Sequence, residues 1–140
     1  MNDFTELAEG FELPVVTKHF TRAQLVAYAN ASGDQNPIHQ DEVVAKSVGL
    51  PDVIAHGMLT MGAAIQVVTD WIGDPTAIIE YSVRMTRPVV VPDTADGVEV
   101  TFGGKIGAIN SDGTIRVDLT AIFAEQSVLG QARALVRLPK

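Results

Sequence analysis

The stretch that decides the fold is Gly57-Met-Leu-Thr-Met-Gly-Ala-Ala-Ile-Gln-Val-Val-Thr-Asp-Trp-Ile72. Its apolar residues cover almost every side of a helix, and Gly73-Asp74-Pro75 ends the helical pattern. At about 1.5 Å per residue this helix runs about 24 Å, the width of a small domain. Because a helix that is apolar all round belongs in a core, the stretch predicts a buried central helix over residues 57–72.

After this helix the hydrophobic period changes to two, which predicts β-strands. Apolar and polar residues alternate over four segments, 79–86, 98–102, 115–121 and 131–138. Strands with one buried face and one solvent-exposed face are typical of an antiparallel sheet. The residues of the first segment that we expect to face the core are Ile79, Tyr81, Val83 and Met85.

Turn and breaker residues set the connections between these strands. The stretch Asn110-Ser-Asp-Gly113 predicts one hairpin, and Glu125-Gln-Ser127 predicts another. Glycines 103, 104 and 107 lie in a strand pattern, where bulges are expected rather than a phosphate-binding loop. A weaker strand is expected over residues 12–16, which Pro14 interrupts.

Helical signals precede the central helix. Thr21 and Gln24 form the pattern of a capping box, followed by an apolar helical face that ends at Ser32 and Gly33. Asp41 begins a second short helix over residues 42–47. The chain therefore reads as one α+β domain over residues 1–140.

Composition narrows the class of protein. The 140 residues are 46% hydrophobic, which excludes disorder, and 10 Lys+Arg against 17 Asp+Glu give a net charge of −7. That charge disfavours nucleic acid and anionic lipid as partners. The absence of Cys excludes disulfides and thiolate chemistry. With Asp3, Glu6 and Glu9 at the start and no apolar run of about 20 residues, we expect a cytoplasmic protein with no membrane partner.

The densest polar cluster is Gly33-Asp-Gln-Asn-Pro-Ile-His39. Asp34 and His39 lie five residues apart, and Asn36 is held extended because it precedes Pro37. A carboxylate and an imidazole held together can move protons in opposite directions on one substrate, which makes this pair a candidate catalytic dyad. The same residue types are common in turns, so a purely structural turn is the alternative.

A second candidate is Ala55-His56-Gly57-Met58 at the start of the central helix. Here the backbone N–H of Gly57 would lie at the positive end of the helix dipole, where it could stabilise an oxyanion. The alternatives are that Gly57 is merely small and that His56 is a capping or packed histidine. Histidines 19, 39 and 56 share no metal-ligand spacing, so we expect no metal and no cofactor. Four arginines form a solvated strand face that could meet a phosphate: Arg84, Arg87, Arg133 and Arg137.

Together the two motifs resemble a known family. The stretch Tyr28-Ala-Asn-Ala-Ser-Gly-Asp-Gln-Asn-Pro-Ile-His39, with Ala45 beyond it, is similar to the hydratase motif of the MaoC-like (R)-specific enoyl-CoA hydratases. The stretch Ile54-Ala-His-Gly-Met-Leu59 matches the start of the family's central helix. Within the family, the chain looks closest to one of the hotdog subunits of the actinobacterial β-hydroxyacyl-ACP dehydratases of the fatty-acid synthase II type. Ile65 stands near the place where some members have a serine.

The resemblance implies a hotdog fold, in which an antiparallel sheet wraps around the central helix. It implies reversible hydration of trans-2-enoyl thioesters of CoA or acyl carrier protein in fatty-acid metabolism, by a homodimer or a heterodimer with a related hotdog subunit. Asp34 would then be the base, His39 would hold the water, Asn36 would brace the loop or bond the dyad, and the Gly57 N–H would bind the thioester oxygen. The alternatives are a hotdog thioesterase and a non-catalytic partner subunit.

Overall fold

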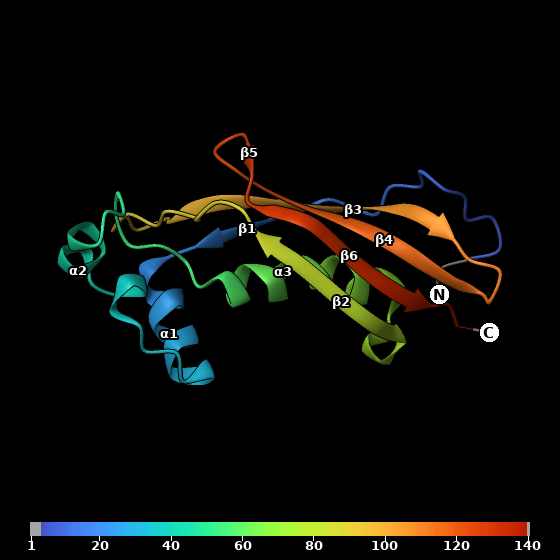
Figure 1. Ribbon diagram of the computed structural model, residues 1–140, viewed down its shortest axis with the longest axis horizontal. Coiled ribbons are helices and arrows are strands. Elements are labelled where there is room, and N and C mark those ends of the chain that lie inside the picture. The colour runs from blue at the N-terminus through green and yellow to red at the C-terminus, as the bar shows by residue number, and fades with distance from the viewer. Residues whose placement is uncertain (1–3, 140) are drawn as a thin grey trace.

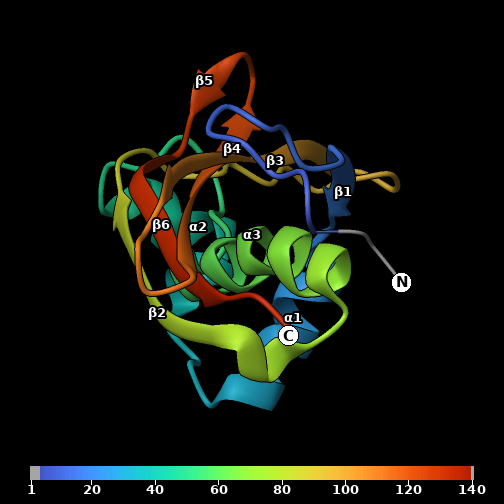
Figure 2. The ribbon, with the colours of Figure 1, turned by 90° about the vertical axis from the view of Figure 1, so that its right-hand side faces the viewer.

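The computed structural model describes residues 4–139, so residues 1–3 and 140 of the expected domain lie outside it. A six-stranded antiparallel sheet curls around the long helix α3 (Gly57–Ile72), as Figures 1 and 2 show. Its order is β1-β3-β4-β6-β2, and β5 pairs with β4. The strands are β1 (Val16–Phe20), β2 (Ile78–Met85), β3 (Val98–Ile109), β4 (Thr114–Phe123), β5 (Gln126–Ser127) and β6 (Leu129–Arg137).

The helices before α3 begin and end where their capping residues stand. In α1 (Arg22–Ser32), Thr21 and Gln24 form the expected capping box, and Gly33 ends the helix with a left-handed φ of 81°. In α2 (Glu42–Ser47), the Asp41 carboxylate accepts two backbone N–H bonds. Two single-turn 3-10 helices complete the set, η1 (Pro37–His39) and η2 (Pro75–Ala77).

The expected alternation holds on the central strands and fails on the edge. The inward residues of β4 and β6 are buried: Ile115, Val117, Leu119, Ala121, Ala132, Ala134 and Val136. On β2, however, Ile79 and Met85 are about half exposed. The physical reason is two register shifts in the pairing of β2 with β6, which rotate the side chains of this edge strand.

Four further expectations concern the turns, the bulges and the first strand. The hairpin at residues 110–113 is confirmed, and a register shift between Ile106 and Ala108 confirms a bulge at Gly107. The bulges expected at Gly103 and Gly104 are wrong, because both glycines pair in regular register with β4. The second hairpin turns at Ala124 and Glu125, which both have positive φ, so residues 126–127 are strand rather than turn. The strand expected over residues 12–16 is wrong: Glu12 makes only an isolated bridge, and β1 begins at Val16, beyond Pro14.

Helix α3 has the expected bounds but is not buried all round. Its buried side faces the concave side of the sheet and carries Thr60, Ala63, Ala64, Val67, Val68, Trp71 and Ile72. Its other side is open because a single sheet covers only one face of a helix, and Met58 there is 61% exposed. Among the described residues, no helix is long and apolar enough to cross a membrane.

Candidate active site

Three chain segments meet at the start of α3. The segment 53–57 lies between the loop 33–39 and the segment 85–91. On one side the Ile54 N–H donates to the Ile38 carbonyl at 3.2 Å, and on the other the Ala55 N–H donates to the Val89 carbonyl at 2.9 Å. Backbone bonds therefore fix the middle segment from both sides.

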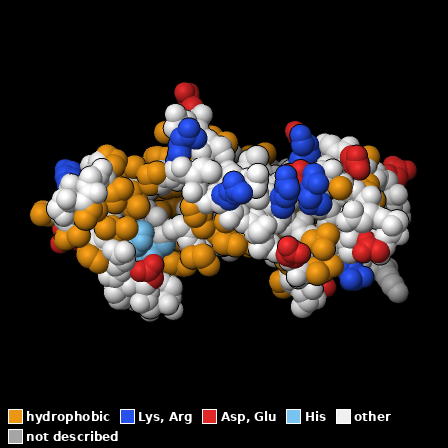
Figure 3. Space-filling model, in the orientation of Figure 1, with side chains coloured by type: hydrophobic (Ala, Val, Ile, Leu, Met, Phe, Trp, Pro, Cys, Tyr) orange, Lys and Arg blue, Asp and Glu red, His pale blue; other side chains and the backbone are white. Residues whose placement is uncertain are grey.

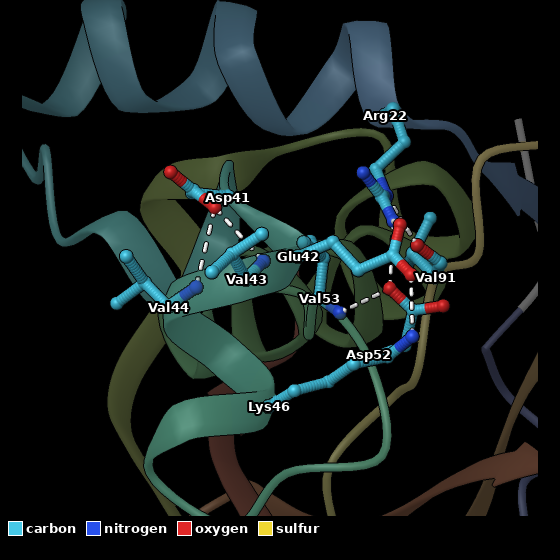
Figure 4. A network of polar contacts seen from close by, with 9 residues as sticks. All are labelled: Arg22, Asp41, Glu42, Val43, Val44, Lys46, Asp52, Val53 and Val91. Carbon is cyan, nitrogen blue, oxygen red and sulfur yellow. Dashed lines mark hydrogen bonds and ion pairs between the residues drawn. The ribbon is translucent and has the colours of Figure 1, made fainter.

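A polar network holds the far ends of these segments together (Figure 4). The Arg22 guanidinium, at the start of α1, donates from Nε to the Val91 carbonyl at 2.6 Å and from Nη2 to the Asp52 carboxylate at 2.7 Å. The same carboxylate oxygen accepts the Val53 N–H, and Glu42 of α2 lies 4.0 Å from Arg22. The bonds of a planar guanidinium to both partners fix their relative orientation as well as their distance.

A cavity of about 320 Å³ opens where the segments meet. Figure 3 shows histidine side chains in a hollow of this face, surrounded mainly by hydrophobic side chains. The cavity is lined by His39, Ile54, Ala55, Gly57, Thr60, Met85, Thr86, Arg87, Pro88, Val89, Val128 and Leu129. An apolar cavity with a few polar groups is the usual form of a small-molecule site.

The structure brings Asp34 and His39 together as the loop motif predicts. A carboxylate oxygen of Asp34 and a ring nitrogen of His39 lie within 4.8 Å of each other. His39 is 8% exposed, and its Nδ1 lies 2.6 Å from the Ile54 carbonyl oxygen. Because a carbonyl oxygen only accepts, Nδ1 carries the proton, and Nε2 is left with a lone pair available to a substrate or a water.

The other polar groups of the loop hold it in shape. The exposed Asp34 carboxylate accepts the Asn36 N–H at 3.1 Å, and the Asn36 side chain accepts the Ile38 N–H at 3.2 Å. Asn36 therefore braces the turn, which was one of its two expected roles. Because the Asp34 carboxylate and a ring nitrogen of His39 lie within 4.8 Å of each other, one water making hydrogen bonds of about 2.8 Å could bond to both.

Gly57 is the first residue of α3 and lines the same cavity. The N-cap residue, His56, makes no side-chain cap bond, and the first N–H groups of a helix have no partner inside it. A Cβ on Gly57 would meet the Met85 side chain at 3.2–3.3 Å. Gly57 therefore suits both interpretations, an oxyanion donor and a small residue at a close approach.

His56 is packed rather than capping. It is 1% exposed, stacks on His39 with ring centroids 3.9 Å apart, and meets the edge of Tyr28. Its Nε2 lies 3.1 Å from the Asp34 backbone carbonyl, while its Nδ1 is the one buried side-chain nitrogen or oxygen of residues 4–139 without a hydrogen-bond partner. Burial lowers the pKa of His56, which favours the neutral ring. An unpartnered buried acceptor costs about 1–3 kcal/mol.

The fold brings His39 and His56 close together, although their spacing in the sequence is not that of metal ligands. Asp34, His39 and His56 offer donor atoms within 4.8 Å of one another, whereas His19 pairs with Glu99 on the sheet. The lone pairs of an imidazole lie in the ring plane, and the planes of His39 and His56 are 27° apart in a stack. Stacked rings direct their lone pairs side by side rather than toward one point, so this arrangement does not fit a metal.

Sequence reasoning missed several residues that line the cavity. Thr60 and Met85 come from α3 and β2, Val128 from the β5–β6 connection and Leu129 from the start of β6. No motif marks them, because their place depends on strand register. Arg87, expected on a solvated strand face that could meet a phosphate, is the cation of this lining, and its Nη1 donates to the Ser127 carbonyl at 3.3 Å.

Comparison with known families gives one matching model. Residues 8–122 match a family model described as MaoC like domain. Among curated relatives, the Mycobacterium tuberculosis protein named 3-hydroxyacyl-thioester dehydratase X is 40% identical over 90 residues, 64% of this chain and 31% of that protein. The (R)-specific enoyl-CoA hydratase of Aeromonas caviae is 29% identical over 126 residues, 89% of this chain and 90% of that protein. The chain spans less than a third of the first relative and 27% of the peroxisomal enoyl-CoA hydratase 2 of Arabidopsis thaliana.

Solved structures share the whole fold. A protein described as a MaoC-like dehydratase superposes with a TM-score of 0.92 at 44% identity, covering 97% of this chain and 42% of that one. The (R)-hydratase of A. caviae gives a TM-score of 0.83 at 23% identity and covers 96% and 99% of the two chains. The ChsH1-ChsH2 complex of M. tuberculosis contains a chain with a TM-score of 0.81 at 25% identity, covering 94% and 98%. The expected hotdog fold is therefore confirmed.

Proposed function

The chain belongs to the family of MaoC-like domains, and we propose that it adds water reversibly to trans-2-enoyl thioesters to give (R)-3-hydroxyacyl thioesters. The observation that carries this proposal is that His39 and Gly57 line one mainly apolar cavity while the Asp34 carboxylate, which is not part of the lining, lies within 4.8 Å of a ring nitrogen of His39. This is a hydro-lyase reaction of fatty-acid metabolism.

In the hydration direction, Asp34 and His39 hold one water between them. The water oxygen forms a bond to C3 while its O–H bond breaks toward the Asp34 carboxylate. The π electrons move to the thioester oxygen, where the Gly57 N–H and the dipole of α3 stabilise the enolate. The enolate then collapses, C2 takes up the proton from the dyad, and all atoms of the water are accounted for. Holding acid and base together keeps charge separation small in an apolar cavity.

The carrier of the acyl group and the assembly are part of the proposal. We infer that CoA or acyl carrier protein presents the thioester, and that the enzyme works in the cytoplasm as a homodimer or with a related hotdog subunit. Support for pairing comes from the uncovered side of α3 and from β2, an edge strand whose Ile79 and Met85 are about half exposed. Light scattering should return twice the mass of the chain, and the mass of a single chain at micromolar concentration would contradict the pairing.

The direct test of the reaction is hydration of crotonyl-CoA. Loss of the enoyl absorbance without release of thiol supports the hydratase. Release of free CoA would identify a thioesterase instead. No change, alone and with a candidate partner subunit, would favour a non-catalytic subunit and contradict the proposal.

A further inference from the structure

His56 connects the proposed base to the start of α3. Its Nε2 lies 3.1 Å from the backbone carbonyl oxygen of Asp34, 22 residues earlier in the chain. Because that oxygen can only accept, Nε2 carries the ring proton and donates it. The residue after His56 is Gly57, which lines the cavity. One side chain therefore joins the two groups that would act on the two ends of the reacting thioester.

Asp34 has few other restraints. Its N–H donates to the hydroxyl of Ser32, the last residue of α1, at 3.2 Å, and its carboxylate accepts the Asn36 N–H, so both partners lie within two residues of Asp34. Among the described residues, the bond from His56 is the only hydrogen bond that ties Asp34 to a segment distant in the sequence. Asp34 is also exposed, so packing contributes little to its placement.

The unpartnered Nδ1 indicates that packing is not the reason for a histidine at this position. A phenylalanine would fill the same buried space between His39 and Tyr28 without leaving a nitrogen unpaired. What phenylalanine lacks is the Nε2–H. The hydrogen bond that Nε2–H donates to the Asp34 carbonyl is therefore what histidine supplies and phenylalanine cannot.

We propose that His56 is a positioning residue, which holds the Asp34 main chain against the start of α3 and so sets the carboxylate relative to the Gly57 N–H. This inference rests on the proposed function, since it takes Asp34 as the base. A base displaced by about 1 Å loses rate on the order of tenfold to a hundredfold.

Two variants separate the donor from the ring. His56→Phe keeps the stacked ring and removes the donor, whereas His56→Gln keeps an amide nitrogen near the Nε2 position and removes the ring. We expect His56→Phe to lower kcat for crotonyl-CoA hydration at least about tenfold with little change in KM, and His56→Gln to restore most of that loss. His19→Gln, on the exposed sheet face, is the control for loss of a histidine.

The reverse ranking, with His56→Phe active and His56→Gln impaired, would overturn the inference, as would equal losses in both variants. Hydrogen exchange of the peptide 33–40 gives a readout that needs no activity: it should quicken in His56→Phe and not in His56→Gln. Unchanged exchange in both would also overturn the inference. Asp34→Asn, assayed beside them, tests the proposed function itself, because a fully active Asp34→Asn refutes the base and says nothing about the exchange result.

Discussion

Replacing Asp34 by asparagine removes the proposed base while keeping the loop. The Asp34 carboxylate is exposed and accepts one bond, from the Asn36 N–H at 3.1 Å, which the Oδ1 of an asparagine also accepts. The free energy of unfolding should therefore change by less than about 0.5 kcal/mol. Loss of a general base should lower hydration at least about 100-fold, which corresponds to about 2.7 kcal/mol of activation free energy.

The assay is the initial rate of crotonyl-CoA hydration, with the melting temperature measured on the same samples. Asp41→Asn is the matched control, because it removes an equal charge near the site and asparagine caps a helix as well as aspartate does. His39→Asn keeps an amide donor for the Ile54 carbonyl and should lose a similar factor to Asp34→Asn. The double variant should be little worse than either one. A folded Asp34→Asn protein within about threefold of the parent rate would refute the dyad.

Three further predictions concern the same site. Gly57→Pro removes the N–H at the first helical position, where proline is tolerated, and should lower the hydration rate about 10²–10³-fold. Gly57→Ala keeps the N–H, and its Cβ meets only the flexible Met85 side chain, so most of the rate should remain. Equal losses in the two variants would argue for a steric role only. Burial lowers the pKa of His56 below 6.5, so as the pH falls the unfolded chain binds a proton at this residue before the folded chain does. The contribution of the neutral His56 to folding stability is therefore complete above about pH 6.5 and is lost as the pH falls below it. A pH series of melting temperatures should detect this loss, and His56→Phe should reduce its size. Arg87 is the cation of the cavity lining, so Arg87→Gln should raise KM for crotonyl-CoA about tenfold, as expected for a lost charged hydrogen bond. The same variant should not change KM for a crotonyl thioester that lacks phosphate. Equal effects on both substrates would exclude a phosphate contact.

The elements with strong local signals could be predicted from the sequence. The capping box at Thr21 and the glycine after Ile72 fix helix ends through bonds within a few residues, and both ends are where the pattern places them. The exposure of Ile79 and Met85 could not be predicted, because it depends on register shifts against β6, more than 40 residues away.

The candidate site divides in the same way. The proximity of Asp34 and His39 follows from one short loop, and the geometry of that loop follows from Asn36 and Pro37. The stack of His39 on His56 and the bond from His56 to the Asp34 carbonyl depend on how two distant segments meet. The sequence places His56 beside Gly57 but contains no signal for either contact.

The segment 53–57 is held by backbone bonds on both sides, and this has a consequence for engineering. A chimera that receives only the motif 33–39 from a relative would keep the proposed catalytic side chains but not the Ile38 and Ile54 pairing that orients them. The smallest portable unit is discontinuous: residues 33–57 together with the segment 85–91, and Arg22 as the link between them. Specificity should therefore transfer between hotdog scaffolds when these parts are exchanged together, whereas exchange of either alone should yield a folded protein with a misaligned cavity.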